Sequence, residues 1–268
     1  MAKVTYSDGI SILQLIVFPF LLACSIYIWK RTGWRAGGPT WRFAVILSVL
    51  RVVGSICTLA QLSFTSTNLR TAATVCNLIG IAPQSLMYMG LLRQIDVEYR
   101  IPPKPLQFLS LVSLIALIIA IVGVDKTEKS GNINALLKAA MIIFLIVFAA
   151  ILAATAWLFK ETQGTLQRFQ KKLFIGIALS APFYTVRLIY AAIADLGHYE
   201  IFQSSLSGNP SASSLTLSLC MSVLEEMIAL AIAVALGWSA MLERDFVIPG
   251  AAVSGDFEQE QEPKAEDV

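Results

Sequence analysis

Charged residues are scarce in this chain of 268 residues: they make up only 14% of it, whereas 56% of the residues are hydrophobic. Soluble domains are usually about 25% charged and about 45–50% apolar. The mean hydropathy of +0.70 points the same way. A protein of this length has too few polar residues here to cover its core with a polar surface. The composition therefore excludes a water-soluble globular enzyme.

Residues that bind metals or carry out redox chemistry are also scarce. The chain has one histidine, His198, and four widely separated cysteines in apolar runs, with no C-x-x-C pair: Cys24, Cys57, Cys76 and Cys220. This pattern excludes a multi-histidine metal site and does not support a zinc site or a thioredoxin-like redox pair. No phosphate loop or Ser-His-Asp motif is present, and the last apolar run lacks the lysine of a retinal protein. We therefore expect no metal, no cofactor and no nucleic-acid partner.

The chain does contain long apolar runs, each close to the roughly 20 residues that a helix needs to cross a bilayer. The runs are continuously apolar rather than alternating, which favours helices over a β-barrel. We predict an all-α polytopic membrane protein, a seven-transmembrane-helix bundle that forms one domain over residues 1–242. The expected helices span residues 10–29, 41–64, 72–92, 106–124, 135–159, 173–196 and 215–242.

Basic residues are divided unevenly between the two ends of the predicted bundle. Twelve Lys and Arg residues flank the helices at one end and five at the other. The positive-inside rule then predicts an N-terminus outside or in the lumen and a C-terminus in the cytosol. Trp29, Trp41 and Trp238 lie near the predicted cytosolic ends, where we expect an interfacial aromatic belt. Residues 243–268, with eight acids and two bases, are expected to form a disordered acidic cytosolic tail.

Four ionisable residues lie well inside apolar runs: Arg51, Arg187, Glu225 and Glu226. Charges at such depth are costly, so they usually face the interior of a bundle and mark a functional site. Pairing an arginine with a glutamate lowers that cost. Because adjacent helical residues point about 100° apart, we expect one glutamate to pair with Arg51 or Arg187 and the other to face a cavity as a proton donor. The alternative is that both glutamates only neutralise arginines and fix helix packing.

Further polar and aromatic side chains accompany these charges. The third run contains Asn77 and Gln84, and the sixth contains Tyr184 and Tyr190, one on each side of the arginine of that run, followed by Asp195 near the outer end. Residues three apart lie on roughly the same face of a helix. We expect these side chains to bind substrate or pair with charges, with the aromatic rings able to stabilise a cation.

Four segments carry a resemblance to a known group: RFAVILSVLRVVGSICTLAQ, NLIGIAPQSLMYMGLLRQI, SAPFYTVRLIYAAIADL and SVLEEMIALAIAVALGW. They resemble a large group of fungal seven-helix integral membrane proteins. That group has an Arg in the second helix, a V-R-x-I-Y segment in the sixth and a Glu in the seventh. These features correspond here to Arg51, to residues 186–190, and to Glu225 or Glu226.

The resemblance, together with an analogy to fungal membrane-bound terpene and meroterpenoid cyclases, implies a function. We expect an intramembrane cyclase or isomerase of secondary metabolism, with Glu225 or Glu226 as the acid that starts cyclisation of a lipophilic prenylated intermediate. Its partners are then a lipophilic small molecule and membrane lipid, and its location the endoplasmic reticulum, with the plasma membrane as an alternative. The competing hypothesis is a non-enzymatic transporter, lipid-stress protein or sensor, although no inverted repeat supports a transporter.

Overall fold

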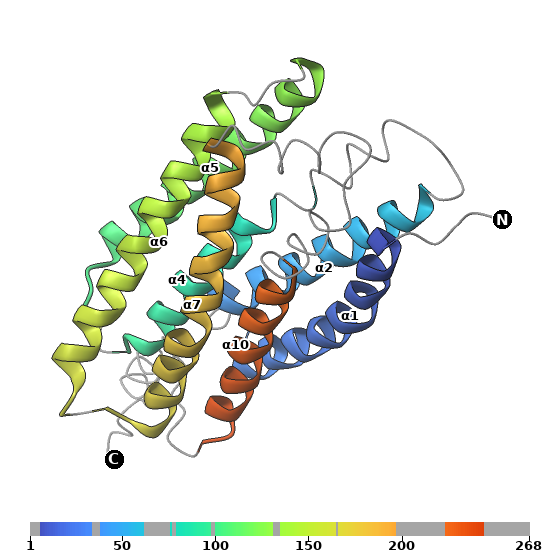
Figure 1. The fold of residues 1–268 in the computed structure, drawn as a ribbon. Coiled ribbons are helices and arrows are strands. Elements are labelled where there is room, and N and C mark those ends of the chain that lie inside the picture. The colour runs from blue at the N-terminus through green and yellow to red at the C-terminus, as the bar shows by residue number, and fades with distance from the viewer. Residues whose placement is uncertain are drawn as a thin grey trace, which may run out of the picture.

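The computed structural model describes residues 6–33, 38–61, 76, 79–97, 100–130, 135–164, 166–196 and 223–243. Within these residues the chain forms seven helices and is all-helical (Figure 1). The helices are α1 (Tyr6–Thr32), α2 (Gly38–Ala60), α4 (Ile81–Ile95), α5 (Pro103–Ser130), α6 (Ala135–Thr162), α7 (Arg168–Leu196) and α10 (Glu225–Met241).

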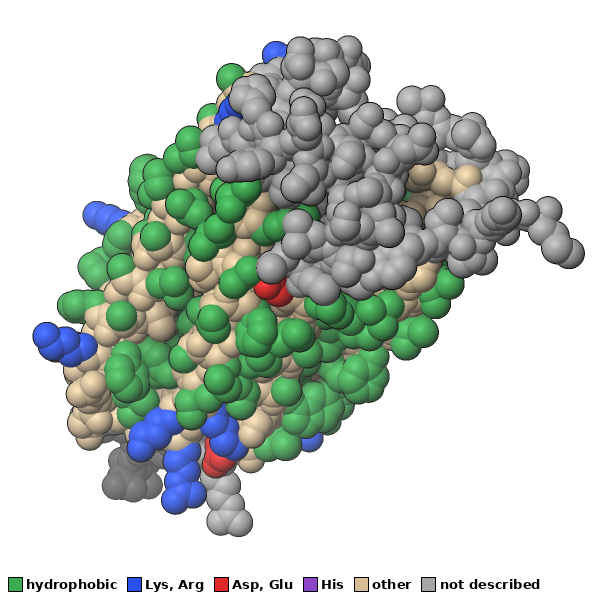
Figure 2. All heavy atoms as spheres, viewed as in Figure 1, with side chains coloured by type: hydrophobic (Ala, Val, Ile, Leu, Met, Phe, Trp, Pro, Cys, Tyr) green, Lys and Arg blue, Asp and Glu red, His purple; other side chains and the backbone are tan. Residues whose placement is uncertain are grey.

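Five of these helices are long and apolar enough to cross a membrane. The candidate spans are Gly9–Thr32, Thr40–Ala60, Pro103–Gly123, Ala135–Thr162 and Arg168–Ile193. Their outward faces carry large apolar side chains, and hydrophobic atoms dominate the described part of the face in Figure 2. An apolar exterior on long helices is what a multi-pass membrane protein presents to lipid.

The other two helices correspond to predicted spans that lie partly outside the described residues. Helix α4 has 15 residues and falls in the predicted range 72–92, but it continues to Ile95. Helix α10 has 17 residues and belongs to the predicted range 215–242, of which the structure describes 223–242. The described parts of these two helices are shorter than a full membrane span. The structure therefore shows a helical bundle in which five helices are candidate membrane spans.

Helix α4 lies in the interior of the bundle. All of its residues except Arg93 are buried, and it contacts α2, α5, α6 and α7. Pro83 lies in its first turn, where the missing backbone N–H is not needed for the helical hydrogen-bond pattern. Beyond its last residue, the Asp96 carboxylate accepts hydrogen bonds from the backbone N–H groups of Arg100 (2.9 Å) and Ile101 (2.8 Å). These bonds hold the turn into α5.

Helix α10 packs along α7 and also contacts α1. Trp41, at the start of α2, is 1% exposed, and its indole ring lies against Gly237 of α10. The prediction that Trp41 belongs to an interfacial belt is therefore wrong, because a small residue on α10 leaves room for the indole inside the bundle. Trp238 is partly buried and stacks on Tyr27 of α1, with 4.6 Å between ring centroids.

At one end of the bundle, polar contacts join the start of α7 to the ends of α4 and α10. Lys172, in the first turn of α7, forms an ion pair with Glu243 at 2.5 Å and donates to the Ser239 carbonyl at 3.1 Å. Gln170 donates from its amide to the Ile95 carbonyl at 2.9 Å. Figure 2 shows Lys and Arg side chains gathered at this end. These contacts stabilise the packing of the start of α7 against the ends of α4 and α10.

Candidate functional site

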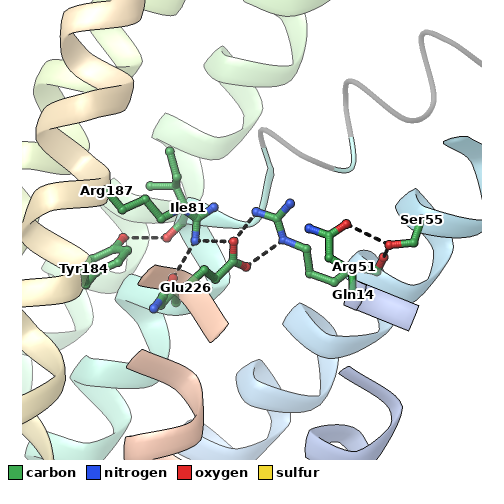
Figure 3. A network of polar contacts seen from close by, with 8 residues as sticks. Gln14, Arg51, Ser55, Ile81, Tyr184, Arg187 and Glu226 are labelled. Atoms are coloured by element: carbon green, nitrogen blue, oxygen red, sulfur yellow. Dashed lines mark hydrogen bonds and ion pairs between the residues drawn. The ribbon is translucent and has the colours of Figure 1, made fainter. Parts of the chain in front are cut away.

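A buried ion triad joins three helices at the start of α10 (Figure 3). Arg51 of α2 donates two hydrogen bonds to the carboxylate of Glu226 on α10, from Nε to Oε1 at 2.8 Å and from Nη2 to Oε2. Arg187 of α7 reaches Oε2 from Nη1 at 2.7 Å. Glu226 is fully buried and each arginine is 2% exposed. The fork of a guanidinium matches a carboxylate, which makes the Arg51 arrangement a strong one.

Polar groups of α4 and α1 surround the triad. Arg187 Nη1 also donates to Gln84 Oε1 at 2.7 Å, and Gln84 is fully buried. On the other side, Ser55 donates to Gln14 Oε1 of α1 at 2.9 Å and to the Arg51 carbonyl at 2.8 Å. The triad therefore has polar neighbours on both sides of the carboxylate, within an otherwise apolar bundle.

Glu225 differs from its neighbour in exposure and in partners. It is partly buried, and its Oε2 is buried without a hydrogen-bond partner among the described residues. Arg187, which binds the neighbouring Glu226, also attracts the Glu225 carboxylate electrostatically. Val223 and Leu224 directly precede the two glutamates and are partly buried, and Leu224 has helical backbone angles (φ −65°, ψ −41°). The two acids thus occupy two distinct environments next to the same arginine.

An aromatic cluster lies beside the triad, formed by Tyr88 of α4, Phe148 of α6 and Tyr184 of α7. Tyr184 is 5.4 Å from Tyr88 and 4.6 Å from Phe148 between ring centroids. Its hydroxyl donates to the Ile81 carbonyl at 2.8 Å, whereas the Tyr88 hydroxyl has no partner within the described helices. Tyr184 belongs to both groups, because Arg187 follows it by three residues on the same helix.

The structure brings together most of the residues that the sequence singled out: Arg51, Gln84, Tyr184, Arg187, Glu225 and Glu226. Tyr190 lies on α7 about one turn beyond Arg187 and is partly buried. Asn77 lies outside the described residues, as does the side chain of Asp195. Among the described residues, no group of three His, Cys, Asp or Glu side chains is placed to hold a metal ion.

Sequence reasoning missed four contributors to the site: Gln14, Ser55, Gly80 and the Ile81 carbonyl. Gln14 is a polar residue inside the first apolar run, and this position could have indicated a buried polar contact, but sequence reasoning concentrated on ionisable residues. Gly80 directly precedes Ile-Ala-Pro, where a helix start is expected from the proline. The contribution of the Ile81 carbonyl cannot be predicted from the sequence, because every residue has a backbone carbonyl.

The charges of the site do not balance within the triad. Two guanidiniums meet one carboxylate, so the triad carries one excess positive charge in an apolar setting when all three groups are ionised. An ionised Glu225 would bring the set of four to neutrality. Since buried uncompensated charge is costly, the excess positive charge of the triad lowers the cost of a Glu225 carboxylate once that group has given up its proton.

The fold and the site together define an all-helical protein with several membrane-type helices and a buried Arg–Glu–Arg triad. The chain belongs to the family described as a domain of unknown function, DUF7702, whose model matches residues 4–243. The triad, Glu225 and the aromatic cluster all lie within the matched range. No curated protein and no solved structure matches the chain.

Proposed function

We propose that the chain is an intramembrane cyclase or isomerase of fungal secondary metabolism that acts on a lipophilic prenylated intermediate, terpenoid or meroterpenoid. In this proposal seven helices cross the endoplasmic reticulum membrane, with the N-terminus in the lumen and the C-terminus in the cytosol. The five apolar helices support a multi-pass protein, and the excess of basic residues at one end supports the orientation. The resemblance to fungal seven-helix membrane proteins supports the setting.

The different surroundings of Glu225 and Glu226 carry the proposal. Two carboxyl groups in different environments are how one site obtains both an acid and a stable anion. Glu226 is held by both arginines and acts as the anion that fixes them. Glu225 has a buried oxygen without a partner in the described residues, which suits a protonated carboxyl that donates to a substrate.

The proposed reaction is an isomerisation in which the proton is returned. Glu225 protonates an epoxide oxygen or an alkene carbon, and the electron pair of the broken C–O or C=C bond moves to the atom that receives the proton. A neighbouring alkene attacks the resulting carbocation and closes a ring. Loss of a proton from carbon to the Glu225 carboxylate ends the sequence and restores the acid. While Glu225 is ionised, its charge balances the excess charge of the arginines, and the rings of Tyr88, Phe148 and Tyr184 stabilise the cation.

The test is product formation in microsomes that contain the full-length protein and are supplied with candidate prenylated epoxides and alkenes. Glu225→Gln removes the proton donor without changing its shape, so we expect product to fall by about 10²–10⁴-fold. Glu161→Gln, a matched change at an exposed glutamate of α6, should leave product formation unchanged. Full product formation by both Glu225→Gln and Glu226→Gln would overturn the proposal.

A non-enzymatic role as a transporter, lipid-stress protein or sensor is the second candidate, and one observation favours it. The triad links α2, α7 and α10 through one carboxylate, and such shared ion pairs suit helices that change partners when a proton binds. Purified protein in liposomes with a pH difference distinguishes the two. Proton-linked uptake of a solute that Glu225→Gln abolishes, without any chemical change of that solute, would support transport and contradict the cyclase.

A further inference from the structure

Gly80 lies in contact with all three members of the triad. It directly precedes α4, has helical backbone angles (φ −55°, ψ −21°) and is buried. A β-carbon at this position would lie 3.1 Å from Arg51 Nη2, 3.2 Å from Arg187 Nη2 and 3.3 Å from Glu226 Oε1. The backbone of residue 80 therefore faces the point where both guanidiniums approach the carboxylate.

The neighbours of Gly80 have little freedom to move away. Arg51 is fixed by its two contacts to Glu226, and Arg187 Nη1 is shared between Glu226 and Gln84. A methyl group at residue 80 would press on charged atoms and offer them no hydrogen bond, so at least one of these three atoms has to shift by a few tenths of an ångström. Since the backbone angles suit any residue, the requirement for glycine comes from the triad and not from the chain conformation.

Gly176 of α7 provides a contrast. A β-carbon there would meet the Leu236 β-carbon at 3.4 Å and its Cδ1 at 3.7 Å, which is ordinary van der Waals contact between α7 and α10. Replacing Gly176 by alanine adds a methyl group between two apolar helices. The same change at Gly80 adds it among three charged atoms.

We propose that Gly80 is a positioning residue of the triad: the absence of a side chain there allows both arginines to bind Glu226 at once. An alanine at position 80 displaces at least one guanidinium from its position on Glu226 by a few tenths of an ångström, and a larger side chain displaces it further. This inference depends on the proposed function only in the step from the triad to the acid Glu225. When Arg187 is displaced, its electrostatic attraction for the ionised form of Glu225 weakens, and proton donation slows.

The first experiment compares Gly80→Ala with Gly176→Ala in the purified full-length protein, by infrared spectroscopy of carboxyl groups and by thermal unfolding. Bands of Glu226 are assigned by difference from Glu226→Gln. We expect Gly80→Ala to shift these bands and to lower Tm by about 2–6 °C. Gly176→Ala should leave the bands in place. Unchanged Glu226 bands in Gly80→Ala would overturn the inference, because a purely structural glycine has no reason to be tied to this carboxylate.

The second experiment is a rescue. Lysine at position 51 keeps the positive charge but lacks Nη2, the atom nearest to the added methyl group. Arg51→Lys should therefore lower Tm less in the Gly80→Ala protein than in the wild type, a coupling that a double-mutant cycle measures. If Gly80→Ala alone does not fold, recovery of folded protein in the double variant supports the inference. Additive losses, or no recovery, would contradict it.

These readouts are independent of any product assay. If Glu225→Gln and Glu226→Gln both leave product formation intact, the cyclase proposal fails, while the coupling between Gly80 and Arg51 is decided by its own measurement. If Gly80→Ala leaves the Glu226 bands unchanged while Glu225→Gln abolishes product, only the role of Gly80 is wrong.

Discussion

Glu225 and Glu226 are neighbours in the chain, yet a helix turns by about 100° per residue and gives them different surroundings. Glu226 points to the bundle interior, where two arginines bind it, and Glu225 is partly buried at its edge. Breaking a buried ion pair from one side costs about 3–5 kcal/mol, because a charge is left without its partner. Glu226 is therefore expected to matter for folding and Glu225 for chemistry.

Two tyrosines next to the triad offer a matched test of buried hydroxyl groups. Tyr184 donates to the Ile81 carbonyl at 2.8 Å, whereas the Tyr88 hydroxyl has no partner in the described part of the chain. Tyr184→Phe should cost about 0.5–1.5 kcal/mol, and Tyr88→Phe should cost less, because the Tyr88 hydroxyl, which lies near Ser180, makes no hydrogen bond as well formed as that of Tyr184. Thermal unfolding in detergent measures both. Equal losses of Tm in the two variants would be inconsistent with this assignment.

At the scale of helices, the sequence was sufficient to predict five of the seven expected spans, which the structure shows as long apolar helices, and to single out four ionisable residues inside apolar runs. It was not sufficient to predict which glutamate binds which arginine. Helix α10 is apolar around most of its circumference, so no hydrophobic stripe indicates which side faces inward. The contact between Glu226 and Arg51 also joins residues 175 positions apart, which no local pattern encodes. Gly80 was missed because its importance depends on two side chains from other helices.

The pairing of α7 with the end of α10 predicts a pH dependence. The hydrogen bond from Lys172 lowers the pKa of Glu243 below its ordinary value of 4.5, and the positive charge of Lys172 adds to this effect. A carboxyl whose pKa is depressed by folding stabilises the protein above that ordinary value, and the contribution is lost as pH falls through the folded-state pKa.

Tm of the wild type should therefore exceed that of Glu243→Gln slightly near neutral pH, and the difference should disappear as the pH falls below 4.5 and through the depressed pKa of Glu243. The effect is small, because the pair is partly exposed to solvent. Thermal unfolding of the two proteins over this pH range measures it. A difference that stays constant with pH would mean that the ionised carboxylate of Glu243 contributes nothing.

At the scale of the whole molecule, the uneven distribution of basic residues predicts the orientation of the bundle. Glycosylation acceptor sequences inserted at the N-terminus and in the tail after residue 243 test it, since only lumenal acceptors are modified. We expect modification at the N-terminus and none in the tail. An acceptor inserted at residues 98–99, in the connection before α5, is a second site predicted to stay unmodified. The opposite pattern would show that the basic end faces the lumen.

The triad also sets an order of events during synthesis. Arg51 and Arg187 enter the bilayer with α2 and α7, but their common carboxylate arrives only with α10, near the end of the chain. At about 5–20 residues per second, the 175 residues between Arg51 and Glu226 take roughly 10–35 s to translate. For most of that interval the nascent protein holds Arg51 alone, and once Arg187 has been made it holds two cations without their carboxylate. Chains that terminate before α10 never gain the carboxylate that both arginines bind, so in them the two buried cations stay without the partner that compensates their charge.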